Sequence, residues 1–204
     1  MAMLSLIISF GLLILAITIH EFAHCFAADR LGDPTPRLKG RLTINPLAHL
    51  DPLGILLPLF LVLSGSSFVF GWGKPAPFDP FNLRNPKRDI MLIALAGPIS
   101  NLGLAVLLSL ALKIIAAPTL ILLISSFIKL NIFLAIFNLL PIHPLDGSKI
   151  LAGILPADWA KEYEGFMRDY GLFLLIFLII PIGGSSIAIN LILPIISWVT
   201  QLLL

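Results

Sequence analysis

The stretch MAMLSLIISFGLLILAITIHEFAHCFAA (residues 1–28) decides the fold class of this sequence. Residues 1–19 carry no charged side chain, and an apolar run of about 20 residues can cross a bilayer as a helix. The run lacks a basic leading region and is longer than the apolar part of a typical signal peptide. We therefore expect a membrane-spanning helix that the mature protein keeps.

The composition of the whole chain also predicts an integral membrane protein. Of the 204 residues, 58% are hydrophobic and 12% are charged, whereas about a quarter of a soluble domain is charged. The net charge is only +2 and the basic residues are scattered, so we expect no nucleic-acid partner. The single cysteine, Cys25, excludes an intrachain disulfide and a CxxC metal site. The lipid bilayer is the expected surrounding.

Six hydrophobic segments recur along the chain. Five of them predict full spans, at residues 3–28, 89–112, 119–140, 165–182 and 186–204. The sixth, residues 53–71, is interrupted by Pro58 and a Gly-Ser-Ser run, and residues 158–170 look like a short interfacial helix. We expect an all-α polytopic membrane protein, a single domain over residues 1–204, with about five full transmembrane helices plus a re-entrant membrane segment.

The distribution of positive charge supports re-entry of the sixth segment. Basic residues flank it on both sides: Arg30, Arg37, Lys39 and Arg41 precede it, and Lys74, Arg84, Lys87 and Arg88 follow it. A full crossing would place the two groups on opposite membrane faces, against the positive-inside rule. A re-entrant hairpin or an even number of passes keeps all eight on the cytoplasmic side, and re-entry is the favoured interpretation. This puts the N-terminus outside. We expect a multi-pass protein of the cell membrane with this orientation.

The motif HEFAH (residues 20–24) places three polar groups at the end of the first span. Residues four apart share a helix face, so His20 and His24 can bind one metal ion. Glu21 then lies beside the metal, where it can act as a general base on water. Two plainer interpretations are a chance match and a polar network that only holds helices together. Ionisable groups within a bilayer are costly and usually functional, which favours the metal site.

A catalytic zinc site combines three protein ligands with one open position, so a third ligand is required. Asp146 directly follows the predicted span 119–140. His20 lies roughly 26 Å along the helix from residue 3, close to the inner interface. If residues 53–71 re-enter, the span 119–140 runs in the same direction and brings Asp146 to that depth. Asp146 is therefore the predicted third ligand.

His143 and His49 are the rival ligands. His143 lies three residues from Asp146, but a histidine beside proline is more often a packed or interfacial residue. His49, in NPLAHLDPLG, is interpreted mainly as a loop or hydrogen-bonding residue near the re-entrant segment. Cys25 projects about 100° around the helix from His24 and is expected to be a small packing residue.

Several motifs together resemble the site-2 protease family of intramembrane zinc metalloproteases. They are HEFAH with the following AADRLGDPTPRLKGRLTINPLAHLDPLG, then FGWGKPAP, AGPISN and NLLPIHPLDG. The chain is similar to the compact prokaryotic branch without a PDZ domain, over roughly residues 10–155. One departure is His143, where a small or apolar residue is expected, and this bears on the polarity of the substrate cleft.

The resemblance implies one Zn²⁺ per chain, with His20, His24 and Asp146 as ligands and Glu21 as catalytic base. It also implies a role near the scissile carbonyl for Asn138, and a membrane-embedded β-structure that suits residues 53–77. The catalytic core would cover about residues 3–155, followed by C-terminal helices at about 158–204. The active site would lie near the cytoplasmic side, and the substrates would be transmembrane proteins cut within or beside their membrane segments.

Three other function classes stand beside intramembrane proteolysis. A di-iron desaturase needs several histidine-rich boxes, but this chain has four histidines and one pair at ligand spacing. A membrane metal transporter needs polar sites linked along a path, whereas the polar groups here are expected at one depth. An inactive protease-derived scaffold is disfavoured because Glu21 and Asp146 are both present.

Overall fold

The computed structural model describes residues 2–64, 71–181 and 186–204, and these residues form helices joined by loops. Within them, three helices are long and apolar enough to cross a membrane: α1 (Ala2–Arg30), α4 (Pro86–Leu112) and α5 (Pro118–Asn138). Their bounds lie within three residues of the predicted spans. The fold is all-helical in the described ranges, as expected.

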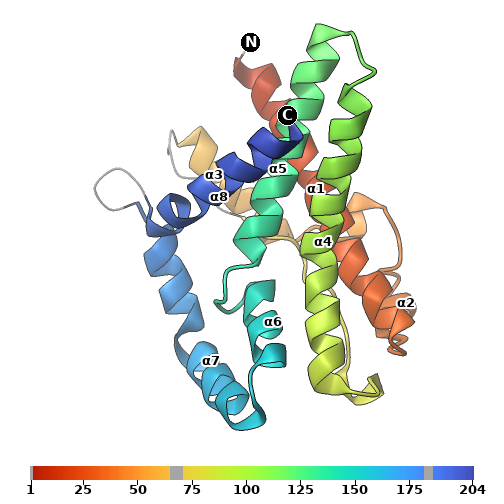
Figure 1. Cartoon of the computed structure of the whole chain (residues 1–204), viewed down its shortest axis with the longest axis vertical. Coiled ribbons are helices and arrows are strands. Elements are labelled where there is room, and N and C mark those ends of the chain that lie inside the picture. Colours follow the sequence, from red (N-terminus) through yellow and green to blue (C-terminus); the bar gives the residue numbers. More distant parts are fainter. Residues whose placement is uncertain (1, 65–70, 182–185) are drawn as a thin grey trace.

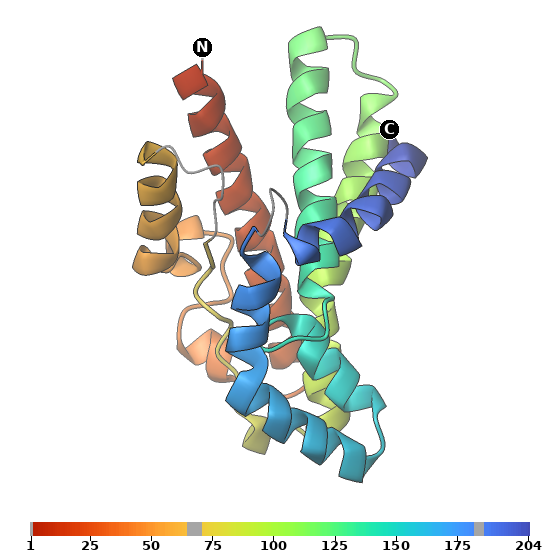
Figure 2. The same cartoon turned by 90° about the vertical axis from the view of Figure 1, so that its left-hand side faces the viewer.

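The remaining helices are shorter or less apolar. They are α2 (Thr35–Leu38), α3 (Pro52–Leu63), α6 (Asp146–Ile154), α7 (Ala157–Ile179) and α8 (Ile187–Leu203), with the 3-10 turns η1 (Pro46–Ala48) and η2 (Pro80–Asn82). The predicted interfacial helix 158–170 and the predicted span 165–182 form one continuous helix, α7. Figure 2 shows that the two halves of α7 meet at an angle, so the interfacial half diverges from the other.

The three long helices determine where the polar residues meet. Figures 1 and 2 show that α1 and α5 run in the same direction and that α4 runs in the opposite one. A buried cluster holds α4, α5 and α8 together, and it is formed by Ala105, Ile128, Ile132, Ile136 and Ile192. The end of α5 therefore lies beside the second half of α1, and α6 begins just beyond it.

The chain before α3 and the chain after it lie side by side. Leu50 and Gly73 form an antiparallel β-bridge, and the N–H of Lys74 donates to the carbonyl of His49 at 2.8 Å. Between them α3 has 12 residues, or about 18 Å, which is shorter than the ~30 Å hydrocarbon core. Outside this bridge the described part of residues 53–77 forms no strand, and residues 65–70 lie outside the described residues.

Asp33 connects the end of α1 by hydrogen bonds to the segment at η2, which precedes α4. Its fully buried carboxylate accepts hydrogen bonds from the N–H and hydroxyl of Thr35 and from the amide of Asn82. The N–H of Asp79 donates to the same group at 2.7 Å. Burial by itself would raise the pKa of the Asp33 carboxyl, but these hydrogen bonds favour its charged form and hold the pKa below its ordinary value.

Candidate metal centre

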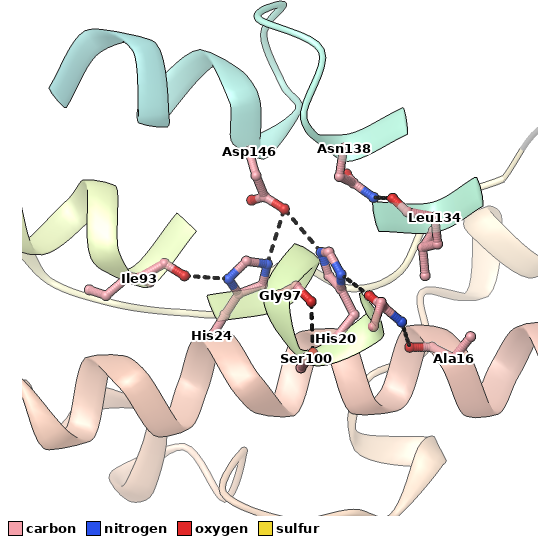
Figure 3. A network of polar contacts seen from close by, with 10 residues as sticks. Ala16, His20, His24, Ile93, Gly97, Ser100, Leu134, Asn138 and Asp146 are labelled. Atoms are coloured by element: carbon pink, nitrogen blue, oxygen red, sulfur yellow. Dashed lines mark hydrogen bonds and ion pairs between the residues drawn. The ribbon is translucent and has the colours of Figure 1, made fainter. Parts of the chain in front are cut away.

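Helix α1 presents both histidines of HEFAH on its buried face, one turn apart. The imidazole Nε2 of His20 lies 3.0 Å from Oδ2 of Asp146, and Nε2 of His24 lies 3.2 Å from the same oxygen. All three side chains are buried. Figure 3 shows them pointing toward one another from α1 and α6. The structure therefore brings together the three residues that the sequence analysis selected as metal ligands.

Asp146 is held at this position by the loop between α5 and α6. The hydroxyl of Tyr163, on α7, donates to the carbonyl of Pro141 at 2.8 Å. Gly147 packs so closely that a Cβ there would collide with the carbonyl oxygens of Leu139 and Leu140. The Asp-Gly pair in NLLPIHPLDG is thus a local packing requirement, because only glycine lets the start of α6 approach the loop this closely.

The Nδ1 atoms of the two histidines have separate partners. Nδ1 of His24 lies 2.7 Å from the carbonyl oxygen of Ile93 (Figure 3), and Nδ1 of His20 lies 2.5 Å from Oδ1 of Asn101. Both partners belong to α4. Metal-ligating histidines usually donate their second ring N–H to such an acceptor, which orients the ring. Neither Ile93 nor Asn101 had a role predicted from the sequence.

This donor set fits a zinc ion. The nitrogen and oxygen atoms of His20, His24 and Asp146 lie within 4.8 Å of one another, and imidazole nitrogens and carboxylate oxygens are established zinc ligands. Gly97, on α4, leaves the necessary space, since a Cβ there would lie 2.6 Å from Cε1 of His20 and closer still to Nε2 of His24. A carboxylate oxygen of Glu21, Oε2, is buried without a hydrogen-bond partner.

A cavity of about 580 Å³ is lined by the three candidate ligands and by Glu21. Asn138 also lines it, although its amide now donates to the carbonyl of Leu134 at 2.9 Å (Figure 3). The returning chain forms a further wall, since a Cβ on Gly73 would lie 2.6 Å from Cγ2 of Ile17 and 3.6 Å from Cγ of Glu21. The cavity thus brings Glu21 and Asn138 to the same space as the three candidate ligands.

The rival residues lie elsewhere in the described structure. His143 is exposed and packs against α7. A Cβ added to Gly171 of α7 would lie 2.7 Å from the Cβ of His143. His49 is fully buried, and its Nε2 lies 2.7 Å from the carbonyl oxygen of Thr43. This is the hydrogen-bonding loop role expected for His49. Cys25 is a fully buried free thiol, in agreement with the predicted packing role.

Comparison with known proteins gives the family. The model of Peptidase family M50 matches residues 113–181. YwhC of Bacillus subtilis, a candidate zinc metalloprotease, is 36% identical over 183 residues, which cover 84% of this chain and 80% of YwhC. Rip2 of Mycobacterium tuberculosis H37Rv, also a candidate zinc metalloprotease, is 30% identical over 82% of this chain and 65% of Rip2. No solved structure matches. The chain belongs to peptidase family M50, the site-2 protease family of intramembrane zinc metalloproteases.

Proposed function

We propose that His20, His24 and Asp146 bind the zinc ion and that Glu21 is the catalytic base. The observation that carries this proposal is the convergence of three buried donor atoms beside an unpartnered carboxylate oxygen in one cavity. Zinc held there would polarise a peptide carbonyl and lower the pKa of water towards ~7. The product would be a cut within or beside the membrane segment of another protein.

Glu21 handles the proton in this proposal. It follows His20 directly on α1, and its Oε2 has no hydrogen-bond partner to displace before a water arrives. The carboxylate takes a proton from the attacking water and delivers it to the leaving nitrogen. A positioned general base of this kind typically contributes 10²–10⁴-fold to the rate.

Asn138 is proposed to stabilise the developing oxyanion of the scissile carbonyl. Asn138 lines the same cavity, and its NH₂ group has two N–H donors, of which one donates to the carbonyl of Leu134 and the other is available to the substrate. Donors of this type contribute about 10²–10³-fold to the rate in other hydrolases.

The ligand assignment predicts the metal content of three variants. His20→Ala, His24→Ala and Asp146→Ala should each lose most of their zinc, because two ligands do not hold the ion tightly. The purified wild-type protein should contain one zinc per chain. The measurement is elemental analysis after dialysis against a weak chelator.

His143→Ala is the matched control, since His143 lies three residues from Asp146 but is exposed and outside the group. It should retain a full equivalent of zinc. If Asp146→Ala kept its zinc and His143→Ala lost it, the third ligand would be His143 and the assignment would be wrong.

We also propose a membrane arrangement for the single domain, residues 1–204. The helices α1, α4 and α5 would each cross the bilayer, and α3 would enter and leave on one face. The two separate crossings expected for residues 165–182 and 186–204 do not fit this arrangement, because the hydroxyl of Ser109, near the outer end of α4, donates to the carbonyl of Leu203 at the end of α8. The bridge between Leu50 and Gly73 supports re-entry, because it places the chain before α3 beside the chain that follows it. With the N-terminus outside, the basic segments on either side of α3 are cytoplasmic.

Cysteine labelling tests this arrangement in a Cys25→Ala background. An impermeant thiol reagent added from outside should label Ala117→Cys, between α4 and α5, but neither Thr43→Cys nor Asn82→Cys. Permeabilised cells should show labelling at all three positions. Labelling of Asn82→Cys but not of Thr43→Cys from outside would mean that α3 and its neighbouring chain cross the bilayer.

A further inference from the structure

Two asparagines form a buried polar chain behind His20. Asn101 on α4 and Asn131 on α5 are both fully buried, and the amide nitrogen of Asn101 lies 2.7 Å from Oδ1 of Asn131. Asn101 reaches His20 at its other end, while the amide nitrogen of Asn131 lies 2.8 Å from the carbonyl oxygen of Phe127. Three helices thus contribute to one line of hydrogen bonds that ends at a candidate metal ligand.

The direction of this line is set by a backbone carbonyl. The oxygen of Phe127 can only accept a hydrogen bond, so Asn131 must turn its NH₂ group toward it and its Oδ1 toward Asn101. Asn101 must then turn its own NH₂ group toward Asn131, where the carbonyl of Ala16 is a second acceptor at 3.3 Å. This orientation leaves Oδ1 of Asn101 facing His20.

An amide oxygen can only accept, so Nδ1 of His20 must carry the ring proton. The lone pair of the neutral ring then lies on Nε2, which faces Asp146. We propose that Asn131 and Asn101 act as a relay of positioning residues that fixes the tautomer and orientation of His20 for metal binding. The inference rests on the proposed metal site and adds two residues that contact neither metal nor substrate.

His24 shows why the relay is needed at His20. The carbonyl of Ile93 fixes the His24 tautomer directly, in a single step. At His20 the acceptor is the side-chain amide of Asn101. The oxygen and the NH₂ group of an amide are nearly the same in shape, so a rotation of the amide would present NH₂ to His20 in place of the oxygen. Among the described residues, the hydrogen bonds to Asn131 and Ala16 oppose that rotation, and the contact with Asn131 is shorter by 0.6 Å (2.7 Å against 3.3 Å).

Zinc affinity of the purified full-length protein tests the relay, measured by competition with a chromogenic chelator. Asn101→Leu should weaken zinc binding by about 10–100-fold, the range typical of such outer partners, and Asn131→Leu by about 10-fold. The double variant should match Asn101→Leu to within about two-fold, because Asn131 acts only through Asn101. Wild-type affinity in Asn131→Leu, or additive losses in the double variant, would overturn the relay.

Ile128→Ala is the packing control, because Ile128 is a fully buried residue on α5 one turn before Asn131. It should lower the thermal midpoint and leave zinc affinity within about two-fold of wild type. An equal loss of zinc in Ile128→Ala and Asn131→Leu would mean that general loosening of α5 explains both. That result would also overturn the relay.

A second pair covers failure of Asn131→Leu to fold. Asn131→Ser keeps a hydroxyl that can donate to Phe127 and accept from Asn101, whereas Asn131→Ala keeps neither function. Serine should bind zinc more tightly than alanine, and equal affinities would count against the relay. His24→Ala separates the two levels of the proposal: if it binds zinc like wild type, the metal site fails and the relay with it. If only the asparagine variants bind like wild type, the relay fails alone.

Discussion

Replacing Glu21 with glutamine should lower the rate of peptide cleavage by about 10²–10⁴-fold, because the amide retains the shape of the side chain but cannot accept the proton. The zinc content should not change, since Glu21 is not one of the three grouped donors. The measurement is a cleavage time course on a single-span membrane protein in detergent or vesicles, with elemental analysis of the same preparation.

Glu164→Gln is the matched control, because it makes the same substitution at an exposed position on α7. It should cleave at the wild-type rate. A Glu21→Gln variant that retained its zinc and also cleaved at the wild-type rate would show that another group moves the proton.

Replacing Gly97 with alanine should weaken zinc binding by roughly 5- to 150-fold, with a parallel loss of cleavage. The added methyl group would enter the space between the two imidazoles, only 2.6 Å from Cε1 of His20. Overpacking of a buried site costs about 1–3 kcal/mol, and the binding of the metal bears that cost if the rings are displaced. Chelator competition measures the affinity directly.

Gly103→Ala serves as the control on the same helix. Nothing lies within 4 Å of a Cβ at Gly103, and both variants gain the same helix propensity, about 1 kcal/mol at most. The zinc affinity of Gly103→Ala should equal that of wild type. Equal affinities in all three proteins would show that the histidine rings do not depend on the space at Gly97.

The long helices were predictable because each is encoded by an apolar run of its own length. The predicted spans 3–28, 89–112 and 119–140 correspond to α1, α4 and α5. The C-terminal region was harder, because charge distinguishes residues 158–170 from the apolar residues 171–179 while the backbone continues through both as α7. The polarity of a segment indicates where a helix meets water, but it does not indicate whether the helix ends at that point.

The candidate site was predictable where its geometry is local. The spacing of His20 and His24 alone places both rings on one face of α1, and Asp146 followed from the common direction of two spans. Family membership then decides for a metalloprotease over a transporter or a desaturase. Ile93 could not be predicted, because it acts through a carbonyl that every residue has.

Asn101, Asn131 and Gly97 form an intermediate case. Asparagines within largely apolar helices are a visible signal, since a polar group inside a bilayer requires a partner. Which partner each one has depends on how α1, α4 and α5 pack, and hydropathy carries no information on that packing. The closeness of Gly97 to both rings is likewise a property of the α1–α4 contact.

The separation of His20 and Asp146 by 126 residues has a consequence for biosynthesis. A ribosome adds about 5–20 residues per second, so His20 is made about 6–25 s before Asp146. During that interval the new chain carries HEFAH without the carboxylate that completes the donor set. If Asp146 is the third ligand as proposed, a nascent chain cannot cut its neighbours in the membrane, and proteolytic activity would begin only after α6 has reached α1.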